Sequence, residues 1–262
     1  MTKRKPLILV SNDDGITSRG IRALVETMHQ IGEVVVVAPN SPQSGMGHAI
    51  TIGNTLRLDS SIAFETEGIE AYECSGTPAD CVKLAKHHVL KNRRPDLVVS
   101  GINHGSNSSI SVLYSGTMSA AIEAAIEGLP AIGFSLCDYS LTADFSHCLE
   151  YVKQIALQVL TSGLPSHVAL NVNIPSQTEG PIKGVKICRQ AQAKYTENFE
   201  KRTDPHGRPY FWMNGEFVDL DKGEDTDMWA LNNGYISIVP CGFDMTAYHT
   251  LPHLNQWEIS TN

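Results

Sequence analysis

Short apolar runs of strand length, separated by segments of helical periodicity, constrain this chain more than any other feature of its sequence. Such runs occupy residues 6–11, 33–38, 96–100 and 131–136. Uninterrupted apolar strands are typical of a parallel sheet that is buried on both faces. Between the first two runs, apolar residues recur at helical spacing, at Ile21, Leu24, Val25 and Met28. The alternation predicts a doubly wound, Rossmann-like α/β fold with a mostly parallel sheet.

Further elements extend this pattern along the chain. A short strand is expected at residues 72–74, and a helix after it, because Thr77 can cap a helix and Pro78 suits its first position. A second helix is expected within residues 117–128, which end in glycine. The remaining core elements are a helix at about 142–160 and a strand at 168–174.

The chain changes character after about residue 180. Residues 182–190 resemble a strand, and the polar stretch 191–224 carries several aromatic side chains, among them Tyr195, Phe199, Tyr210, Phe211 and Trp212. Exposed aromatic side chains on such a stretch typically mark a partner surface, so we expect a C-terminal β-hairpin arm. Residues 1–180 are predicted to form the α/β core. Residues 181–262 are predicted to form the arm and an oligomerisation segment that returns to the core through a strand at 235–240.

Composition narrows the class of protein. The 262 residues carry a formal net charge of −8, which disfavours long nucleic acid as a partner but leaves a small anionic substrate possible. The six cysteines lack zinc-ligand spacing, which favours reduced thiols of a cytoplasmic protein. The apolar run near the N-terminus is too short for a signal peptide, and no stretch reaches the length of a membrane span. We therefore expect a cytoplasmic protein that does not associate with membranes.

Two adjacent carboxylates, Asp13 and Asp14, follow the first predicted strand. Ligands of open α/β sheets bind at the carboxyl ends of the strands. Like charges so close repel one another unless a cation lies between them, and a hard divalent cation prefers oxygen ligands. The pair is also compatible with a simple Asp-Gly turn and a helix cap.

Other strand-end loops supply further candidates. Ser44 and His48 lie in a Gly/Ser/Pro-rich loop at 39–53, and Asn103 and His104 follow the strand at 96–100. Each of these residues is by itself weak evidence for a ligand site, because loop serines and turn asparagines commonly have no ligand role.

Ser115, Gly116 and Thr117 begin a predicted helix. Free backbone N–H groups at a helix start bind anions, and small residues let a phosphate come close. An ordinary Ser/Thr cap would show the same pattern. With an acidic pair nearby we favour a phosphate site there, with Asn12 as a further phosphate-side residue.

These motifs together resemble the SurE family, the stationary-phase survival proteins, which are metal-dependent 5′/3′-nucleotidases. The matching stretches are ILVSNDDG (8–15), VVVVAPNSPQSGMGHAIT (34–51), CSGTPADCVKLA (74–85), RPDLVVSGIN (94–103) and YSGTMSAAIEAA (114–125), with a weaker match at 226–240. The chain departs from the family pattern at Ser41-Pro42-Gln43, where relatives carry an arginine-rich stretch, and at His249, which is displaced by one position.

The resemblance implies a ligand set and an assembly. It places one divalent cation per subunit, Mg²⁺ or Mn²⁺, on Asp13, Asp14, Ser44 and Asn103, with residues 115–117 in the phosphate pocket. It also implies a homodimer or homotetramer with exchanged C-terminal arms.

The resulting hypothesis is a phosphomonoesterase that transfers the phosphoryl group of nucleoside 5′- and 3′-monophosphates to water, with Asp13 and Asp14 as its catalytic residues. A nucleotide-binding stress protein without significant turnover is the alternative. A metal-dependent deacetylase would need histidine ligands beside the acidic pair, where this chain has Ser11 and Asn12.

Overall fold

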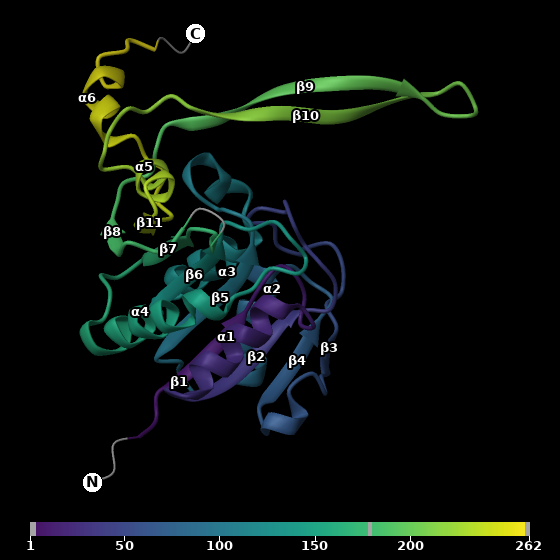
Figure 1. Cartoon of the computed structure of the whole chain (residues 1–262), viewed down its shortest axis with the longest axis vertical. Coiled ribbons are helices and arrows are strands. Elements are labelled where there is room, and N and C mark those ends of the chain that lie inside the picture. Colours follow the sequence, from purple (N-terminus) through teal and green to yellow (C-terminus); the bar gives the residue numbers. More distant parts are fainter. Residues whose placement is uncertain (1–3, 178–179, 260–262) are drawn as a thin grey trace.

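The computed structural model describes residues 4–177 and 180–259. Most described strands form one nine-stranded sheet, and two long strands form a separate hairpin (Figure 1). The sheet strands are β1 (Leu7–Ser11), β2 (Glu33–Pro39), β3 (Leu58–Ser60), β4 (Glu70–Cys74), β5 (Leu97–His104), β6 (Ala131–Leu136), β7 (Val168–Ile174), β8 (Val185–Ile187) and β11 (Ile236–Gly242). They lie side by side in the order β3-β4-β2-β1-β5-β6-β7-β11-β8.

Helices cover both faces of this sheet. The helices α1 (Arg19–His29) and α4 (Leu149–Ser162) pack on one face, and α2 (Pro78–Leu84) and α3 (Gly116–Ile126) on the other. In β1, Ile8 and Val10 belong to the first of these cores, whereas Leu7 and Leu9 belong to the second. Because successive side chains of a strand point to opposite faces, a strand buried on both must be apolar throughout. The predicted doubly wound, mostly parallel α/β fold is therefore confirmed.

The order of the strands reverses direction at β1. The chain proceeds from β1 to its parallel neighbour β2 on one side, and later places β5 parallel to β1 on the other. Ligands of doubly wound sheets bind at such a switch point, outside the carboxyl ends of the strands. The turn after β1, the loop after β2 and the end of β5 therefore meet at one edge.

The C-terminal part of the chain adds two strands to this sheet. Strand β11 pairs antiparallel with β7, and β8 pairs parallel with β11. The short helix α5 (Asp227–Asn232) leads into β11, and α6 (Leu251–Leu254) lies in the tail that follows. No helix within the described residues is both long and apolar enough to cross a membrane.

The hairpin formed by β9 (Ala193–Thr203) and β10 (Pro209–Asp219) projects far from the sheet (Figure 1). Eleven residue pairs join its strands in an unbroken antiparallel register. Beyond its root, both faces of the hairpin are exposed. The predicted C-terminal hairpin arm is therefore present.

Several predicted boundaries differ from the observed ones. Strand β5 continues past the expected 96–100 to His104, with a register shift between Ser100 and Asn103. Strand β8 is shorter than the expected 182–190, and β3 and α5 were not anticipated. The polar end of β5 hides its continuation, because the apolar run that predicts a strand stops at Val99, although β5 is buried as far as Asn103.

Helix α4 begins at Leu149 rather than near Thr142. The Asp144 carboxylate accepts hydrogen bonds from the backbone N–H and hydroxyl of Ser146, and the Ser140 hydroxyl accepts one from the backbone of Thr142. Such local side-chain bonds offer the backbone an alternative to the helix. They explain why the helix starts seven residues later than its composition predicts.

Candidate active site

The turn after β1 carries the acidic pair. The side-chain amide of Asn12 donates to the carbonyl of Gly15, at 3.0 Å, and to the Ser18 hydroxyl, at 2.9 Å. Ser18 in turn caps α1. Gly15 has φ +93, a left-handed conformation that glycine adopts without strain. These contacts fix the short path from strand to helix and present Asp13 and Asp14 at the sheet edge.

Asp13 is buried, with only 4% of its surface exposed. Its carboxylate accepts a hydrogen bond from the Thr117 hydroxyl at the start of α3. Gly116 lies directly against it, since a Cβ added to that glycine would be 2.6 Å from the Asp13 Cβ. Burial raises the pKa of Asp13 to about 6, with the Thr117 hydrogen bond opposing the shift and the charge of Asp14 adding to it. Because burial disfavours its negative charge, a cation bound beside Asp13 would stabilise the ionised carboxylate.

Asp14 is half-buried beside the end of β5. Its carboxylate accepts a hydrogen bond of 3.3 Å from the backbone N–H of His104. Burial raises the pKa of Asp14, and that hydrogen bond opposes the shift. The two carboxylates therefore connect the turn after β1 to two different neighbours, α3 and β5.

Asn103 reaches the same edge from β5. Its side-chain amide donates to the carbonyl of Gly105, at 2.7 Å, and the residue is buried. The preceding Gly101 has φ +122, and a Cβ there would lie 2.3 Å from the carbonyl oxygen of Phe134. Only glycine allows β5 to bend there, just before Asn103 and the next residue, whose backbone contacts Asp14.

Ser44 lies on the exposed loop that follows β2. The loop approaches the acidic pair directly, because the backbone N–H of Gln43, the preceding residue, donates to the carbonyl of Asp13 at 2.7 Å. It is also held at Gly47, whose N–H donates to the Tyr114 carbonyl, at 3.2 Å. The Ser44 side chain is exposed and thus accessible to a ligand at this edge.

The start of α3 closes the site. The Ser115 hydroxyl caps the helix by accepting from the backbone N–H of Met118, at 3.0 Å. The Thr117 hydroxyl donates to Asp13. The Ser115 side chain therefore caps the helix, whereas the Thr117 side chain holds Asp13 of the acidic pair. What remains for an anion is the positive end of an 11-residue helix, next to Gly116.

The chemistry of these residues suits a hard divalent cation. All the predicted ligands offer oxygen atoms, and the buried side-chain oxygen of Asn12 has no hydrogen-bond partner in the described structure. Within residues 4–177 and 180–259, no three His, Cys, Asp or Glu side chains form a metal-holding group. The predicted ligands themselves are all oxygen donors, a set that fits Mg²⁺ or Mn²⁺.

An ion-pair network centred on a buried glutamate lies next to this edge and was not predicted from the sequence. Glu123 on α3 is buried, accepts a hydrogen bond from Lys83 of α2 at 2.5 Å, and lies 2.9 Å from the His48 ring nitrogen. Burial alone would raise the pKa of Glu123, but its hydrogen bonds with His48 and Lys83 hold it below the usual value. His48 therefore links the Ser44 loop to α3. The sequence could not predict this link, because His48 and Glu123 are far apart in the chain.

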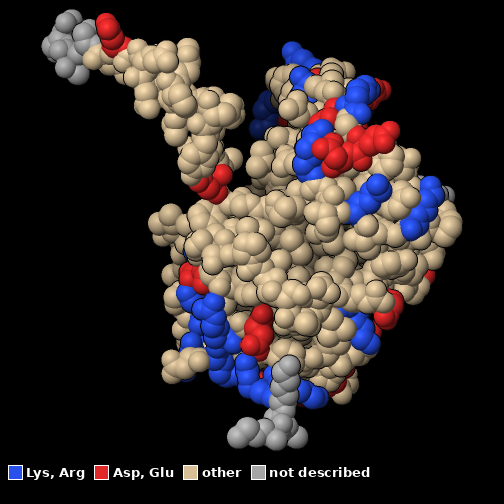
Figure 2. Space-filling model, turned by 90° about the vertical axis from the view of Figure 1, so that its left-hand side faces the viewer, with Lys and Arg blue, Asp and Glu red and all other residues tan. Residues whose placement is uncertain are grey.

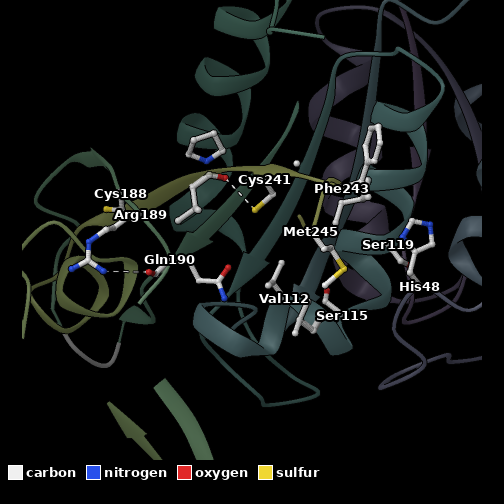
Figure 3. A pocket seen from close by; sticks show the side chains of 15 residues that line it. His48, Val112, Ser115, Ser119, Cys188, Arg189, Gln190, Cys241, Phe243 and Met245 are labelled. Atoms are coloured by element: carbon white, nitrogen blue, oxygen red, sulfur yellow. Dashed lines mark hydrogen bonds between the residues drawn. The ribbon is translucent and has the colours of Figure 1, made fainter. Parts of the chain in front are cut away.

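His48 also borders a hollow with a volume of about 520 Å³. Figure 3 shows His48, Ser115 and Ser119 along one side, and Cys188, Arg189 and Gln190 at the opposite end. Phe243 and Met245 of the C-terminal tail form part of its wall.

A buried polar network supports the loop after β5. The Asn173 side-chain oxygen of β7 accepts from the backbone N–H of Asn107, at 2.7 Å, and Asn171 donates to the Asn107 carbonyl, at 2.9 Å. Asp227 accepts from the backbone N–H groups of Ser109, at 2.7 Å, and Ala191, at 2.9 Å. Asn171 and Asn173 are polar residues within the otherwise apolar strand β7. That interruption is the sequence signal that could have identified them.

The other two candidate histidines are His104 and His249, of which His104 bonds Asp14 through its backbone N–H. The His104 ring is 2.9 Å from the Ser140 carbonyl and packs edge-on against Phe145. His249 lies on the exposed C-terminal tail.

The C-terminal tail, residues 243–259, projects from the body of the molecule and carries little charge (Figure 2). Its exposed apolar side chains are Phe243, Met245, Tyr248, Leu251, Leu254, Trp257 and Ile259. An apolar surface of this extent is typical of a protein interface.

Fold and site together define a class: a doubly wound α/β protein with an acidic pair and a helix N-terminus at its topological switch point. A family model described as "Survival protein SurE" matches residues 8–197. The chain belongs to the SurE family, as its motifs predicted.

Relatives match along nearly the whole chain. A protein of Cytophaga hutchinsonii named "5'-nucleotidase SurE" is 71% identical, with 96% of each chain covered. One of Christiangramia forsetii with the same name is 60% identical, covering 99% of this chain and all of the relative. The crystal structure of the Sure protein from Aquifex aeolicus, 39% identical, superposes with a TM-score of 0.81 over 95% of this chain and 98% of that one.

Proposed function

We propose that this protein is a divalent-metal-dependent phosphatase that hydrolyses nucleoside 5′-monophosphates, and 3′-monophosphates in addition. The observation that carries the proposal is the position of Asp13 and Asp14, between the end of β5 and the N-terminus of α3. The names of its close relatives, "5'-nucleotidase SurE", support the same activity.

In this proposal Asp13, Asp14, Ser44 and Asn103 hold one Mg²⁺ or Mn²⁺ per subunit. When bound, such an ion neutralises negative charge on a phosphoryl oxygen and lowers the pKa of a bound water. The protein would thus supply two charged and two neutral oxygen ligands to the ion.

The protein's own groups position the phosphate. The positive end of the α3 dipole at Gly116 attracts the anion, and Asn12 is assigned to the same phosphate site. The Thr117 hydroxyl keeps the Asp13 carboxylate in one orientation. Phosphoryl transfer needs little covalent help, so positioning and electrostatics can supply most of the rate.

Phosphate release from a panel of nucleoside monophosphates tests the proposal. Activity should disappear on chelation with EDTA and return with Mg²⁺ or Mn²⁺. Full activity after exhaustive chelation would exclude the metal site. Tight nucleotide binding without phosphate release would instead favour a nucleotide-binding stress protein.

We also propose that the protein assembles as a homodimer or homotetramer through its C-terminal arm. Supporting this, the arm exposes large aromatic side chains on strands that bury almost nothing within one chain: Phe199, Tyr210, Phe211 and Trp212 are 41–60% exposed. Light scattering at micromolar concentration is the test, and a monomer there would contradict the assembly.

A cytoplasmic location and small substrates complete the proposal. Cys74, Cys81, Cys148 and Cys188 are buried thiols, which suits a reducing compartment. The net charge of −8 disfavours long nucleic acid as a partner.

A further inference from the structure

A second hollow, of about 240 Å³, lies where the root of the hairpin meets the loop after β5. Three aromatic rings line it, of Tyr139, Tyr195 and Phe217, and three serine side chains, of Ser106, Ser108 and Ser111. The rest of its lining consists of Cys137, Pro175, Met228, Leu231 and Asn232.

This hollow is lined by a residue that follows a predicted metal ligand closely in the chain. Asn103 donates to the carbonyl of Gly105, and Gly105 lies beneath the Tyr139 ring, since a Cβ there would be 2.3 Å from that ring. Ser106 is the next residue and lines the hollow. An extended chain spans at most about 3.5 Å per residue, so the hollow begins within about 10 Å of Asn103. Ser106 therefore lies within the length of a nucleotide from Asn103.

Two of the aromatic rings are accessible to a ligand. Tyr195 of β9 and Phe217 of β10 are direct cross-strand partners, and their ring centroids are 4.8 Å apart at an angle of 63°. Tyr195 is 41% exposed and Tyr139 is 71% exposed. Nucleobases of any kind stack on aromatic rings, because every base has a π-face. The pair in the hairpin holds the Tyr195 ring in place before a ligand arrives.

The hydroxyl rim is held rigidly as well. Ser106 donates to the Asn173 side-chain oxygen, at 3.4 Å, and lies 2.8 Å from the Ser108 hydroxyl. The same Asn173 oxygen accepts a hydrogen bond from the backbone N–H of Asn107. Both asparagines are buried. A loop fixed by buried hydrogen bonds loses little entropy when a ligand binds. Ribose hydroxyl groups are suitable partners for such a rim.

We propose that this hollow is the nucleoside subsite: the base stacks on Tyr139 and Tyr195, and the ribose contacts Ser106 and Ser108. The proposal rests on the nucleotidase function proposed above and assigns a substrate role to the root of the hairpin. The larger hollow beside His48 is a weaker match. Its only aromatic ring beyond His48 is Phe243 of the tail, so it offers no pair of aromatic rings between which a base could stack.

The experiment compares a substrate with a base and one without. Initial rates are measured on adenosine 5′-monophosphate and on ribose 5-phosphate for the wild type, Tyr139→Leu, Tyr195→Leu and Tyr195→Phe. Loss of a stacking ring should lower kcat/KM for the nucleotide by about 5- to 150-fold, mainly through KM. The loss should be confined to the substrate with a base, and Tyr195→Phe should retain most of the activity.

Two control variants test whether the base binds in the larger hollow or on the arm instead. Met245→Ala changes the larger hollow, and Trp212→Ala changes the arm away from its root. Neither should alter the ratio of the two activities. If Met245→Ala alters the ratio and the tyrosine variants do not, the base lies in the larger hollow and the proposal is wrong. Equal losses on both substrates in the tyrosine variants would also overturn it, because they indicate a structural role.

A binding measurement makes the result independent of turnover. Saturation-transfer NMR with adenosine, in EDTA, should show contact to the base protons in the wild type and loss of that contact in Tyr195→Leu. If the wild type hydrolyses neither phosphate ester, the proposed function fails, and the NMR result still decides the subsite. Equal adenosine contact in wild type and variants overturns the subsite alone.

Discussion

The switch-point edge of the sheet and the hairpin arm are built on opposite principles. At the edge, Asp13 and Asn103 are buried, and each polar group is placed by contacts from residues distant in sequence. Along the arm, β9 and β10 pair only with each other, and their aromatic side chains face solvent. The contacts that position the edge come from within one chain, whereas the arm exposes aromatic surface that the chain itself does not bury.

The two regions meet at the root of the arm. The Ser109 hydroxyl donates to the carbonyls of Ala191 and Ala193, and Asp227 bonds the backbones of Ser109 and Ala191. Ser109 begins the 3₁₀ helix Ser109–Tyr114, which leads directly to the start of α3. The arm is therefore anchored to the same loop that borders the candidate active site. Substitutions in the edge, at the root and along the arm should have separable effects.

The largest effect is expected at the edge. Asp14→Asn should lower turnover on a nucleoside monophosphate by at least about 10²–10³-fold, because it removes a charged ligand from a hard cation. The melting temperature of the metal-free protein should stay constant or rise slightly, since one of two neighbouring carboxylates whose pKa values are raised by burial is removed.

The control for Asp14→Asn is Asp59→Asn, the same chemical change on the exposed edge strand β3. It should leave both turnover and melting temperature unchanged. If Asp14 only shaped the turn, asparagine would replace it well, so near-wild-type turnover would contradict a metal role.

Sequence predicted the edge well because its signals are local. The apolar run of β1, the acidic turn at 13–14 and the small residues at 115–117 each lie within a few positions of one another. The α/β fold and the family assignment followed from them and are confirmed. The roles of Asp13, Asp14, Ser44 and Asn103 as ligands remain predictions.

Other parts of the site could not be predicted, because they arise from contacts between distant segments. Glu123 looks like an ordinary surface residue of a helix, but Lys83 and His48 enclose it. Asn173 looks like a defect in an apolar strand, but the loop after β5 covers it. Their burial depends on how the layers pack, and a periodicity within one element carries no such information.

The root of the arm should show the next largest effect. Asp227→Ala should destabilise the fold by about 2–4 kcal/mol, because three backbone N–H groups, of Ser109, Ala191 and Met228, lose their acceptor. Asp225→Ala, which removes only an exposed ion pair with Arg189, should cost less than about 1 kcal/mol. Denaturant unfolding measures both, and equal effects would contradict the anchoring role of Asp227.

Glu123→Gln should have a smaller, pH-dependent effect. The folded-state pKa of Glu123 lies below its ordinary value of 4.5, so its stabilising contribution is present above that pH. The contribution is lost as the pH falls through the lowered folded-state pKa. The variant should be about 1–3 kcal/mol less stable than the wild type at pH 7, and the difference should shrink below pH 4.5. A constant difference between about pH 3 and pH 7 would show that the Glu123 charge is unimportant.

The smallest effect on the fold, and the clearest contrast with the edge, is expected in the middle of the arm. Trp212 is 56% exposed and lies opposite Glu200 on β9, so Trp212→Ala removes little packing within one chain. Its effect on unfolding at low protein concentration should stay within about 0.5 kcal/mol. If the arm binds a second copy, however, the same ring lies in an interface, where buried tryptophans contribute much of the affinity. The variant should then dissociate at protein concentrations where the wild type remains assembled, as light scattering over a dilution series would detect. Ile62→Ala removes a side chain that is 82% exposed on the core and should leave assembly unchanged. A Trp212→Ala protein that assembles like the wild type would show that the middle of the arm is not the interface, and would leave the apolar C-terminal tail as the surface to test next.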